Sequence, residues 1–267
     1  MLVLELVIYF LFGLAVGSFS NVCIYRLPLK QSIIQPRSHC PECKTPIPYY
    51  YNIPLLSYLY LQGRCSFCQK QISRGYFIVE LLTALLYLYF GWQYGLTFNL
   101  LFFFILTPIL IMIFCIDYAH FIIPDVLVLI LGILGIVKLL TPDPDSLFSP
   151  LYSSVLGALI AFIFLGGLII FYLYVRKLEG MGFGDLKLFV VLGFLFGLHG
   201  ILFILIFSSL SGSVLGSIIL WRNKKNYKTQ LPFAPYIIAA TFIYILIGPQ
   251  MIAQIEKIAM HYLISSF

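Results

Sequence analysis

Residues 101–117 read LFFFILTPILIMIFCID, an almost uninterrupted apolar run that ends on an aspartate. A predominantly apolar stretch of about 20 residues has the length of a helix that crosses a bilayer. A second run follows another aspartate closely, in residues 180–197, GMGFGDLKLFVVLGFLFG. Placing an ionisable group near hydrocarbon costs at least about 2.5–3.5 kcal/mol, so a functional role is the default interpretation. Asp117 and Asp185 are therefore the first candidates for a functional site.

The whole chain shares this apolar character. Of its 267 residues, 61% are hydrophobic and 10% are charged, whereas soluble domains carry about 25% charged residues. The sequence predicts an all-α polytopic membrane protein with about eight transmembrane helices. These helices are expected near residues 3–25, 76–93, 98–117, 125–140, 153–175, 185–198, 200–221 and 233–253.

Lysines and arginines are clustered along the chain. Of the 16, seven lie within residues 26–74, three within 176–187 and four within 222–228. Eight spans place all three clusters on one side of the membrane, which the positive-inside rule identifies as the cytoplasm. Asp143 and Asp145 then mark the opposite side, and both termini are expected outside. The net charge of +6 follows from this topology, and we expect no nucleic-acid partner.

The predicted domains are a first transmembrane helix at 1–27, a cytoplasmic module at 28–75 and a transmembrane core at 76–267. The first helix is interpreted as an uncleaved span, because it carries Glu5 and lacks the basic start of a signal peptide.

The module holds four of the six cysteines, as two CxxC pairs. Cys40-Pro41-Glu42-Cys43 is followed, after 21 intervening residues, by Cys65-Ser66-Phe67-Cys68. This pattern is typical of a zinc ribbon, whose closed four-thiolate shell makes the metal structural. A segment this small builds little core, and metal binding supplies folding energy. The alternative, disulfides or redox-active pairs, is disfavoured by the cytoplasmic placement.

The two aspartates lie in short motifs at the cytoplasmic ends of their spans. The first motif is CIDYAHFIIPD at 115–125, and the second is GMGFGDLK at 180–187. Gly182 and Gly184 are expected to permit close backbone approach and positive φ before the helix. Two carboxylates that converge at one membrane face indicate acid–base chemistry, and we favour an aspartyl protease.

These motifs, taken in order, resemble those of type IV prepilin peptidases, a family of bifunctional membrane enzymes. Residues 17–28, GSFSNVCIYRLP, resemble the family's GSFLNVVIYRLP, and residues 73–83, SRGYFIVELLT, resemble the segment that begins its second span. Residues 231–236, LPFAPY, resemble its PFGP motif, with Ala234 replacing the usual glycine. The GxGD motif alone is shared with presenilin-like proteases, so the ordered set carries the resemblance.

The resemblance implies an enzyme of the bacterial cytoplasmic (inner) membrane. Such enzymes cleave the basic leader of type IV prepilins and pseudopilins on the cytoplasmic side, after a glycine. They then N-methylate the new terminal residue, usually phenylalanine, with S-adenosylmethionine. The resemblance assigns the catalytic aspartates to Asp117 and Asp185. It assigns the zinc ligands to Cys40, Cys43, Cys65 and Cys68.

Three other charged residues are weaker candidates. Asp125 is interpreted first as a helix-start residue after Pro124. Lys187 either pairs with a carboxylate or marks the positive flank of its span. Glu80 either holds the methyl donor or the substrate amine, or forms an interspan hydrogen bond. The sequence lacks a Rossmann-type glycine-rich turn, so the S-adenosylmethionine site is not identified; the region to examine is 26–80 with nearby Asn21.

Two other functions stay open at this point. One is a GxGD peptidase without methyl transfer, which a loop lacking cysteines would have favoured. The other is an ion-coupled transporter with a zinc docking module, which would carry acidic or polar groups through the depth of the bilayer.

Overall fold

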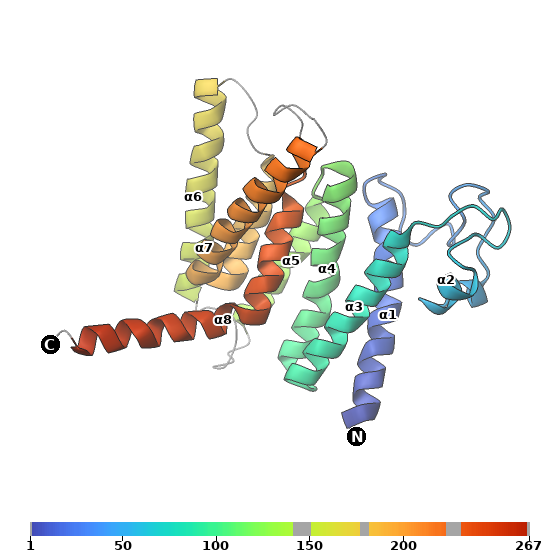
Figure 1. Ribbon diagram of the computed structural model, residues 1–267, viewed down its shortest axis with the longest axis horizontal. Helices are drawn as coiled ribbons and strands as arrows, with labels where there is room; N and C mark the ends of the chain where they lie inside the picture. Colours follow the sequence, from blue (N-terminus) through green and yellow to red (C-terminus); the bar gives the residue numbers. More distant parts are fainter. Residues whose placement is uncertain (1, 141–150, 177–181, 223–230, 266–267) are drawn as a thin grey trace. The chain divides into compact units, whose positions relative to one another are not determined.

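The computed structural model describes residues 2–140, 151–176, 182–222 and 231–265 (Figure 1). Asp143 and Asp145, predicted to mark the outer side, lie outside these ranges. Within them the chain is helical and carries two isolated β-bridges but no strand, so the all-α prediction is confirmed. The helices are α1 (Leu2–Arg26), η1 (Tyr49–Tyr51), α2 (Leu56–Tyr60), α3 (Arg74–Tyr94), α4 (Phe98–His120), α5 (Asp125–Leu139), α6 (Leu151–Arg176), α7 (Phe183–Arg222) and α8 (Ala234–Ser265).

Five of these helices, α1, α3, α4, α6 and α7, are long and apolar enough to cross a membrane. The chain is therefore a multi-pass membrane protein. The apolar part of α8, Ala234–Gly248, is shorter, and α5 has only 15 residues. The last helix continues to Ser265, beyond the predicted limit at residue 253, because the polar residues near its end do not break the helix.

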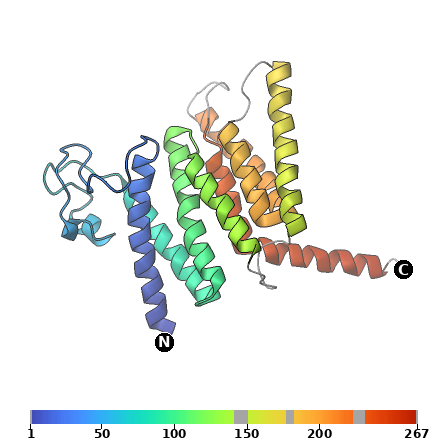
Figure 2. The same cartoon turned by 180° about the vertical axis from the view of Figure 1, so that it is seen from behind.

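Helix α7 consists of two helices that fold back on each other at Gly197. This residue has φ 67° and ψ −166°, outside the helical region. The ring of Phe233 lies 6.2 Å from that of Phe189, and a Cβ at Gly212 would lie 3.1 Å from the same ring. In a straight helix Phe189 and Gly212 would be roughly 35 Å apart. The reversal, visible from behind in Figure 2, divides α7 into the two separate spans predicted from the sequence.

The chain forms two compact units, residues 1–116 and 117–267. In the first, α1 packs on α3 through small residues. A Cβ added at Gly13 would lie 2.7 Å from the Cα of Ala84, so the two backbones approach closely. Aromatic stacking joins α3 to α4, with the Tyr87 and Phe104 rings 4.0 Å apart.

In the second unit, α6 packs on the first half of α7 at two glycines. A Cβ on Gly157 would lie 2.5 Å from the carbonyl oxygen of Gly193, which is closer than any side chain allows. Helix α8 packs against α7 through Tyr244, whose ring lies 5.5 Å from that of Phe196. These contacts bring the start of α7 and the start of α8 to the same end of the unit, beside the last turn of α4.

Candidate functional site

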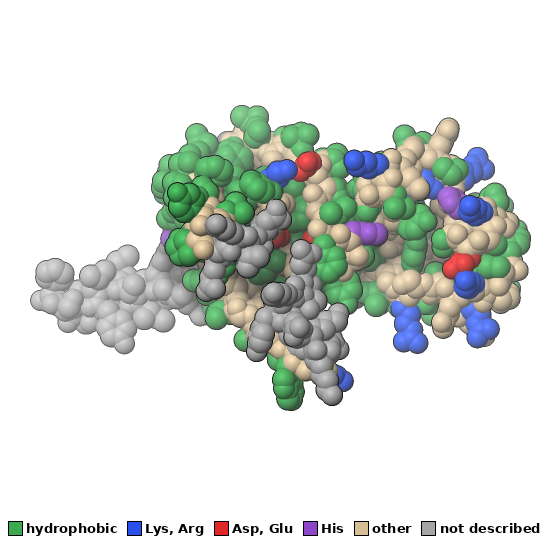
Figure 3. Space-filling view, turned by 90° about the horizontal axis from the view of Figure 1, so that it is seen from above, with side chains coloured by type: hydrophobic (Ala, Val, Ile, Leu, Met, Phe, Trp, Pro, Cys, Tyr) green, Lys and Arg blue, Asp and Glu red, His purple; other side chains and the backbone are tan. Residues whose placement is uncertain are grey.

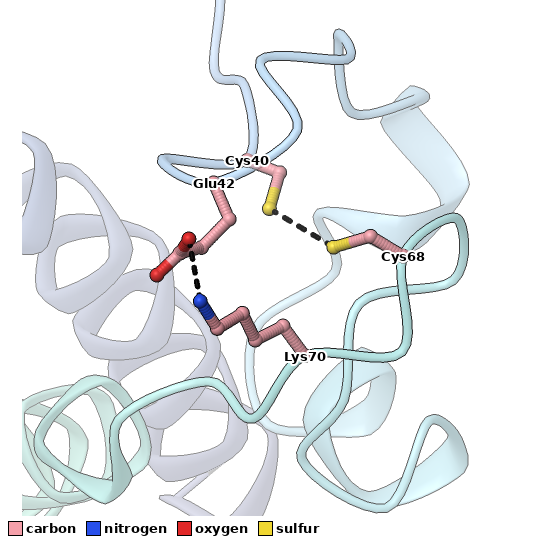
Figure 4. A network of polar contacts seen from close by, with 4 residues as sticks. All are labelled: Cys40, Glu42, Cys68 and Lys70. Atoms are coloured by element: carbon pink, nitrogen blue, oxygen red, sulfur yellow. Dashed lines mark hydrogen bonds and ion pairs between the residues drawn. The ribbon is translucent and has the colours of Figure 1, made fainter.

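The four cysteines of the module form a cluster that could hold a metal ion. Their sulfur atoms all lie within 4.8 Å of one another, and the Sγ atoms of Cys40 and Cys68 are 3.8 Å apart (Figure 4). A tetrahedral zinc with Zn–S bonds of about 2.3 Å requires sulfur separations of about 3.8 Å. Two thiolates from each CxxC turn therefore match the donor set of a structural zinc.

The two CxxC turns are built alike. In the first, the N–H of Cys40 donates to Thr45 and the N–H of Lys44 donates back to Cys40; the second repeats this pattern between Cys65, Lys70 and Gln69. An ion pair between Lys70 and Glu42, 2.7 Å long, connects the two turns (Figure 4).

The thiols differ in acidity. Hydrogen bonds from the hydroxyl and the backbone of Thr45 lower the pKa of Cys43 to about 6. The backbone N–H of Lys70 also favours the thiolate of Cys68, but burial and the neighbouring thiols outweigh it and raise that pKa to about 11. One exposed thiol is thus ready to bind a cation at neutral pH while another holds its proton.

The aspartate site lies where α4 ends and α7 and α8 begin. Asp117, in the last turn of α4, is buried, with 5% exposure. Its Oδ2 accepts a 3.0 Å hydrogen bond from the N–H of Ala234, the first residue of α8. Asp185, in the first turn of α7, is half-buried and lies close enough to Asp117 for the two charges to interact. The chain thus brings two carboxyl groups from distant segments together.

A tight turn follows the end of α4, just after Asp117. Phe121 adopts a left-handed conformation with φ 58°, and its N–H donates to the carbonyl of Asp117 over 2.9 Å. Such a φ is unusual for a bulky residue and is often found at functional sites. The turn directs Ile123 onto Gly184, where an added Cβ would lie 3.3 Å from the Cβ of Ile123.

The two glycines of the GxGD motif act differently from the expectation. Gly184 does permit a close approach, against Ile123. The carbonyl of Gly182 accepts the N–H of Asp185 over 3.2 Å. Neither residue has positive φ, so that part of the prediction was wrong, because the helix geometry already begins at Phe183.

Lys187 and Asp125 form an ion pair of 2.8 Å that links the start of α7 to the start of α5. Both side chains are well exposed, at 51% and 79%. Asp125 is the first residue of α5, which confirms the prediction of a helix-start residue. Of the two interpretations of Lys187, pairing with a carboxylate is the one found.

Glu80 belongs to the first unit, where it borders a cavity. The side chain is buried, and Oε2 accepts a 2.8 Å hydrogen bond from the N–H of Leu55. The cavity has a volume of about 380 Å³, and Asn21 and Tyr76 also line it. It lies in the region that the sequence marked for the methyl donor, and its volume is within the usual range of small-ligand pockets, about 300–1,000 Å³.

Two backbone donors were not predicted. The N–H of Ala234 binds Asp117, and the N–H of Leu55 binds Glu80. The LPFAPY motif was a usable signal for the first, because proline at 235 lacks an N–H and leaves Ala234 as a first-turn donor. Leu55 gave no signal, since any residue can supply an N–H.

Comparison with known proteins gives consistent matches along the chain. Residues 11–94 match the bacterial peptidase A24 N-terminal domain, and residues 102–217 match the type IV leader peptidase family. The chain is 36% identical over 264 residues to the prepilin leader peptidase/N-methyltransferase of Pseudomonas aeruginosa, covering 90% of each chain. It is 33% identical over 254 residues to the protein of the same name from Bacillus subtilis, covering 95% of this chain and 98% of the other. No solved structure matches.

Proposed function

Because the chain belongs to the type IV leader peptidase family, we propose that it cleaves the basic leader of type IV prepilins or pseudopilins after a glycine. We propose further that it N-methylates the new terminal residue with S-adenosylmethionine. The observation that supports the peptidase half is that Asp117 and Asp185 lie within electrostatic range of each other at one end of the second unit. Cleavage would take place on the cytoplasmic side of the inner membrane, where the basic clusters lie.

The two carboxyl groups suit a water-dependent cleavage. Two nearby carboxyl groups in a low dielectric do not both ionise easily, so they share one proton. The ionised member takes a proton from water as the water oxygen attacks the carbonyl carbon of the scissile glycine. The protonated member hydrogen-bonds the carbonyl oxygen and then protonates the departing amine. The N–H of Ala234 holds the Asp117 carboxylate in one orientation throughout.

The cavity beside Glu80 is our proposed site for S-adenosylmethionine, which supplies an electrophilic methyl group on a sulfonium. A buried carboxylate among aromatic side chains suits a cationic ligand. Glu80 provides the carboxylate, and Tyr25, Tyr51, Tyr58 and Tyr76 line the same cavity. These residues would bind and orient the donor near the substrate amine.

The cysteine cluster is proposed to hold a structural zinc that fixes this cavity. Cys40 and Cys65 belong to the four-cysteine cluster and also line the cavity. Losing the metal would therefore disturb the cavity wall, so methyl transfer should depend on the module more than peptide hydrolysis does. The division into a first helix at 1–27, a zinc module at 28–75 and a peptidase core at 76–267 belongs to this proposal.

The test is to incubate the purified protein with a prepilin peptide and isotopically labelled S-adenosylmethionine, and to weigh the products. We expect a peptide shortened by its leader and heavier by one labelled methyl group. Cleavage without methylation would favour the peptidase that lacks methyl transfer. If neither product forms, the proposal is contradicted, and the transporter becomes the favoured function. A Glu80→Gln variant should cleave normally and methylate at least about tenfold more slowly, because a cationic ligand loses its buried counter-charge.

A further inference from the structure

Residues 45–63 of the module form an uncharged segment inside an otherwise basic one. They read TPIPYYYNIPLLSYLYLQG and contain no Asp, Glu, Lys or Arg. Lys44 and Arg64 lie immediately on either side. We call residues 45–63, which include η1 and α2, the uncharged segment. A cytoplasmic loop in contact with water alone would not be expected to exclude charge over this length.

The uncharged segment exposes its large apolar side chains. Tyr49 is 87% exposed, Tyr60 79%, Leu56 65% and Leu59 61%. No residue of η1 or α2 is buried. Figure 3 shows Lys and Arg side chains gathered over the module, with apolar side chains between them. Large apolar side chains exposed together on one short segment indicate a contact surface.

The uncharged segment lies beside the membrane-spanning helices, below their ends. The N–H of Leu55 binds Glu80, and the rings of Tyr58 and Phe77 are 5.5 Å apart. Since α3 begins at Arg74, Glu80 lies roughly 9 Å inside the span.

Helix α1 also places the uncharged segment below the ends of the spans. Pro54 lines a cavity together with Ala15, which lies roughly 16 Å before the end of α1 at Arg26. Figure 1 shows α2 on the side of the spans rather than beyond their ends.

We propose that the uncharged segment lies in the boundary between lipid headgroups and acyl chains, with Tyr49, Leu56, Leu59 and Tyr60 in contact with lipid. Tyrosine is enriched at this boundary, and interfacial helices bury their apolar face about 5–10 Å into it. The depth of Glu80 matches that range. The proposal is independent of the proposed function, because it rests only on α1 and α3 spanning the membrane.

This placement also indicates where the cavity beside Glu80 lies relative to the bilayer. Residues of the uncharged segment line the cavity together with residues of α1, of α3 and of the two CxxC turns. With the uncharged segment at the headgroup boundary, the cavity that it lines lies at the membrane surface. A substrate whose N-terminus emerges from the bilayer would reach the cavity without leaving the membrane.

The test uses single tryptophans in the full chain, reconstituted in lipid vesicles. Trp92 and Trp221 are replaced by Phe, and Leu56→Trp and Tyr60→Trp are introduced separately, so that failure of one leaves the other. Phe67→Trp is the matched control, since it is 53% exposed on the same module but sits in the CxxC turn beside the Lys70–Glu42 ion pair. Bromine-labelled lipids should reduce emission about twofold or more at positions 56 and 60, because that depth contacts the acyl chains. Aqueous iodide should quench only position 67.

Three results would overturn the proposal. Iodide quenching at both 56 and 60, without quenching by bromolipid, would show that the segment faces water. If positions 56 and 60 are protected from iodide only when chemical crosslinking traps dimers, the uncharged segment contacts a second copy of the chain. If the same positions are protected from iodide only after prepilin is added, the uncharged segment contacts the substrate.

Discussion

Asp117 is held by a backbone N–H rather than by a side chain. Its Oδ2 accepts the N–H of Ala234, which every residue except proline retains. Substituting the donor residue therefore leaves this hydrogen bond in place, unless the new residue is proline. The sequence named Asp117 and Asp185 as candidates, because charges at span edges need a reason. The sequence could not predict that the two residues lie close together. Their proximity depends on the packing of α7 and α8 against the end of α4, which involves residues far apart in the chain.

In the metal-free protein the cysteines should differ in reactivity. Cys43 and Cys68 are both exposed, but the pKa of Cys43 is lowered to about 6 and that of Cys68 is raised to about 11. At pH 7.5 Cys43 is mostly thiolate and Cys68 mostly thiol, so iodoacetamide should modify Cys43 roughly tenfold faster or more.

Peptide mass mapping over time measures these two rates. The rate at Cys43 should fall as the pH is lowered through about 6, because the thiolate becomes protonated. Equal rates at the two cysteines would contradict the assigned acidities.

The Lys187–Asp125 ion pair should contribute little to cleavage. Both side chains are exposed, and exposed pairs are worth about 0.2–1 kcal/mol, or at most roughly fivefold in rate. We expect Lys187→Met and Asp125→Asn each to retain most of the cleavage rate, and the combined Asp125→Lys, Lys187→Asp exchange to recover part of any loss. A loss as complete as that expected for changes at Asp117 or Asp185 would instead place Lys187 or Asp125 in contact with substrate.

At the scale of elements, hydropathy predicted the helices well and their contacts hardly at all. Separate spans were expected at 185–198 and 200–221, and the reversal at Gly197 divides α7 accordingly. Hydropathy measures the apolar content of each segment, which is what a bilayer selects. Gly157 and Gly193 look like any other glycines in the sequence, although their backbones touch.

Replacing a glycine at a helix contact by alanine should destabilise the protein. The same replacement at a glycine that faces open space should not. Gly157→Ala would place Cβ 2.5 Å from the carbonyl of Gly193, and overpacking of this kind costs about 1–3 kcal/mol. Gly166, on the same helix, has nothing within 4 Å of an added Cβ. Thermal unfolding in detergent should show a lower midpoint for Gly157→Ala and an unchanged or higher one for Gly166→Ala. Equal midpoints would contradict the packing of α6 on α7.

At the scale of the whole molecule, the charge clusters predict one orientation in the membrane. The ends that carry the basic clusters also carry the cysteine module in the first unit and the aspartates in the second. The positive-inside rule predicts that these ends face the cytoplasm. The cysteine cluster was predictable because its spacing is local, whereas the cavity beside Glu80 was located only to a region, because its walls come from three segments.

Reporter fusions test this orientation. Alkaline phosphatase, which is active only outside the cytoplasm, should be active when fused after residue 145 or at the C-terminus, and inactive after residue 70 or 226. Green fluorescent protein at the same four positions should give the reverse pattern. Phosphatase activity after residue 226 would overturn the orientation and with it the cytoplasmic cleavage.

If Asp117 and Asp185 act together in cleavage, changing either one should separate cleavage from methylation. Asp117→Asn and Asp185→Asn are each supplied with intact prepilin and, separately, with prepilin already lacking its leader, in the presence of labelled S-adenosylmethionine. We expect either change to abolish cleavage of intact prepilin. Methylation of the pre-cleaved substrate should persist in both variants, which would show that each variant is folded. Full cleavage by either variant, measured by mass, would contradict the pair as the catalytic groups.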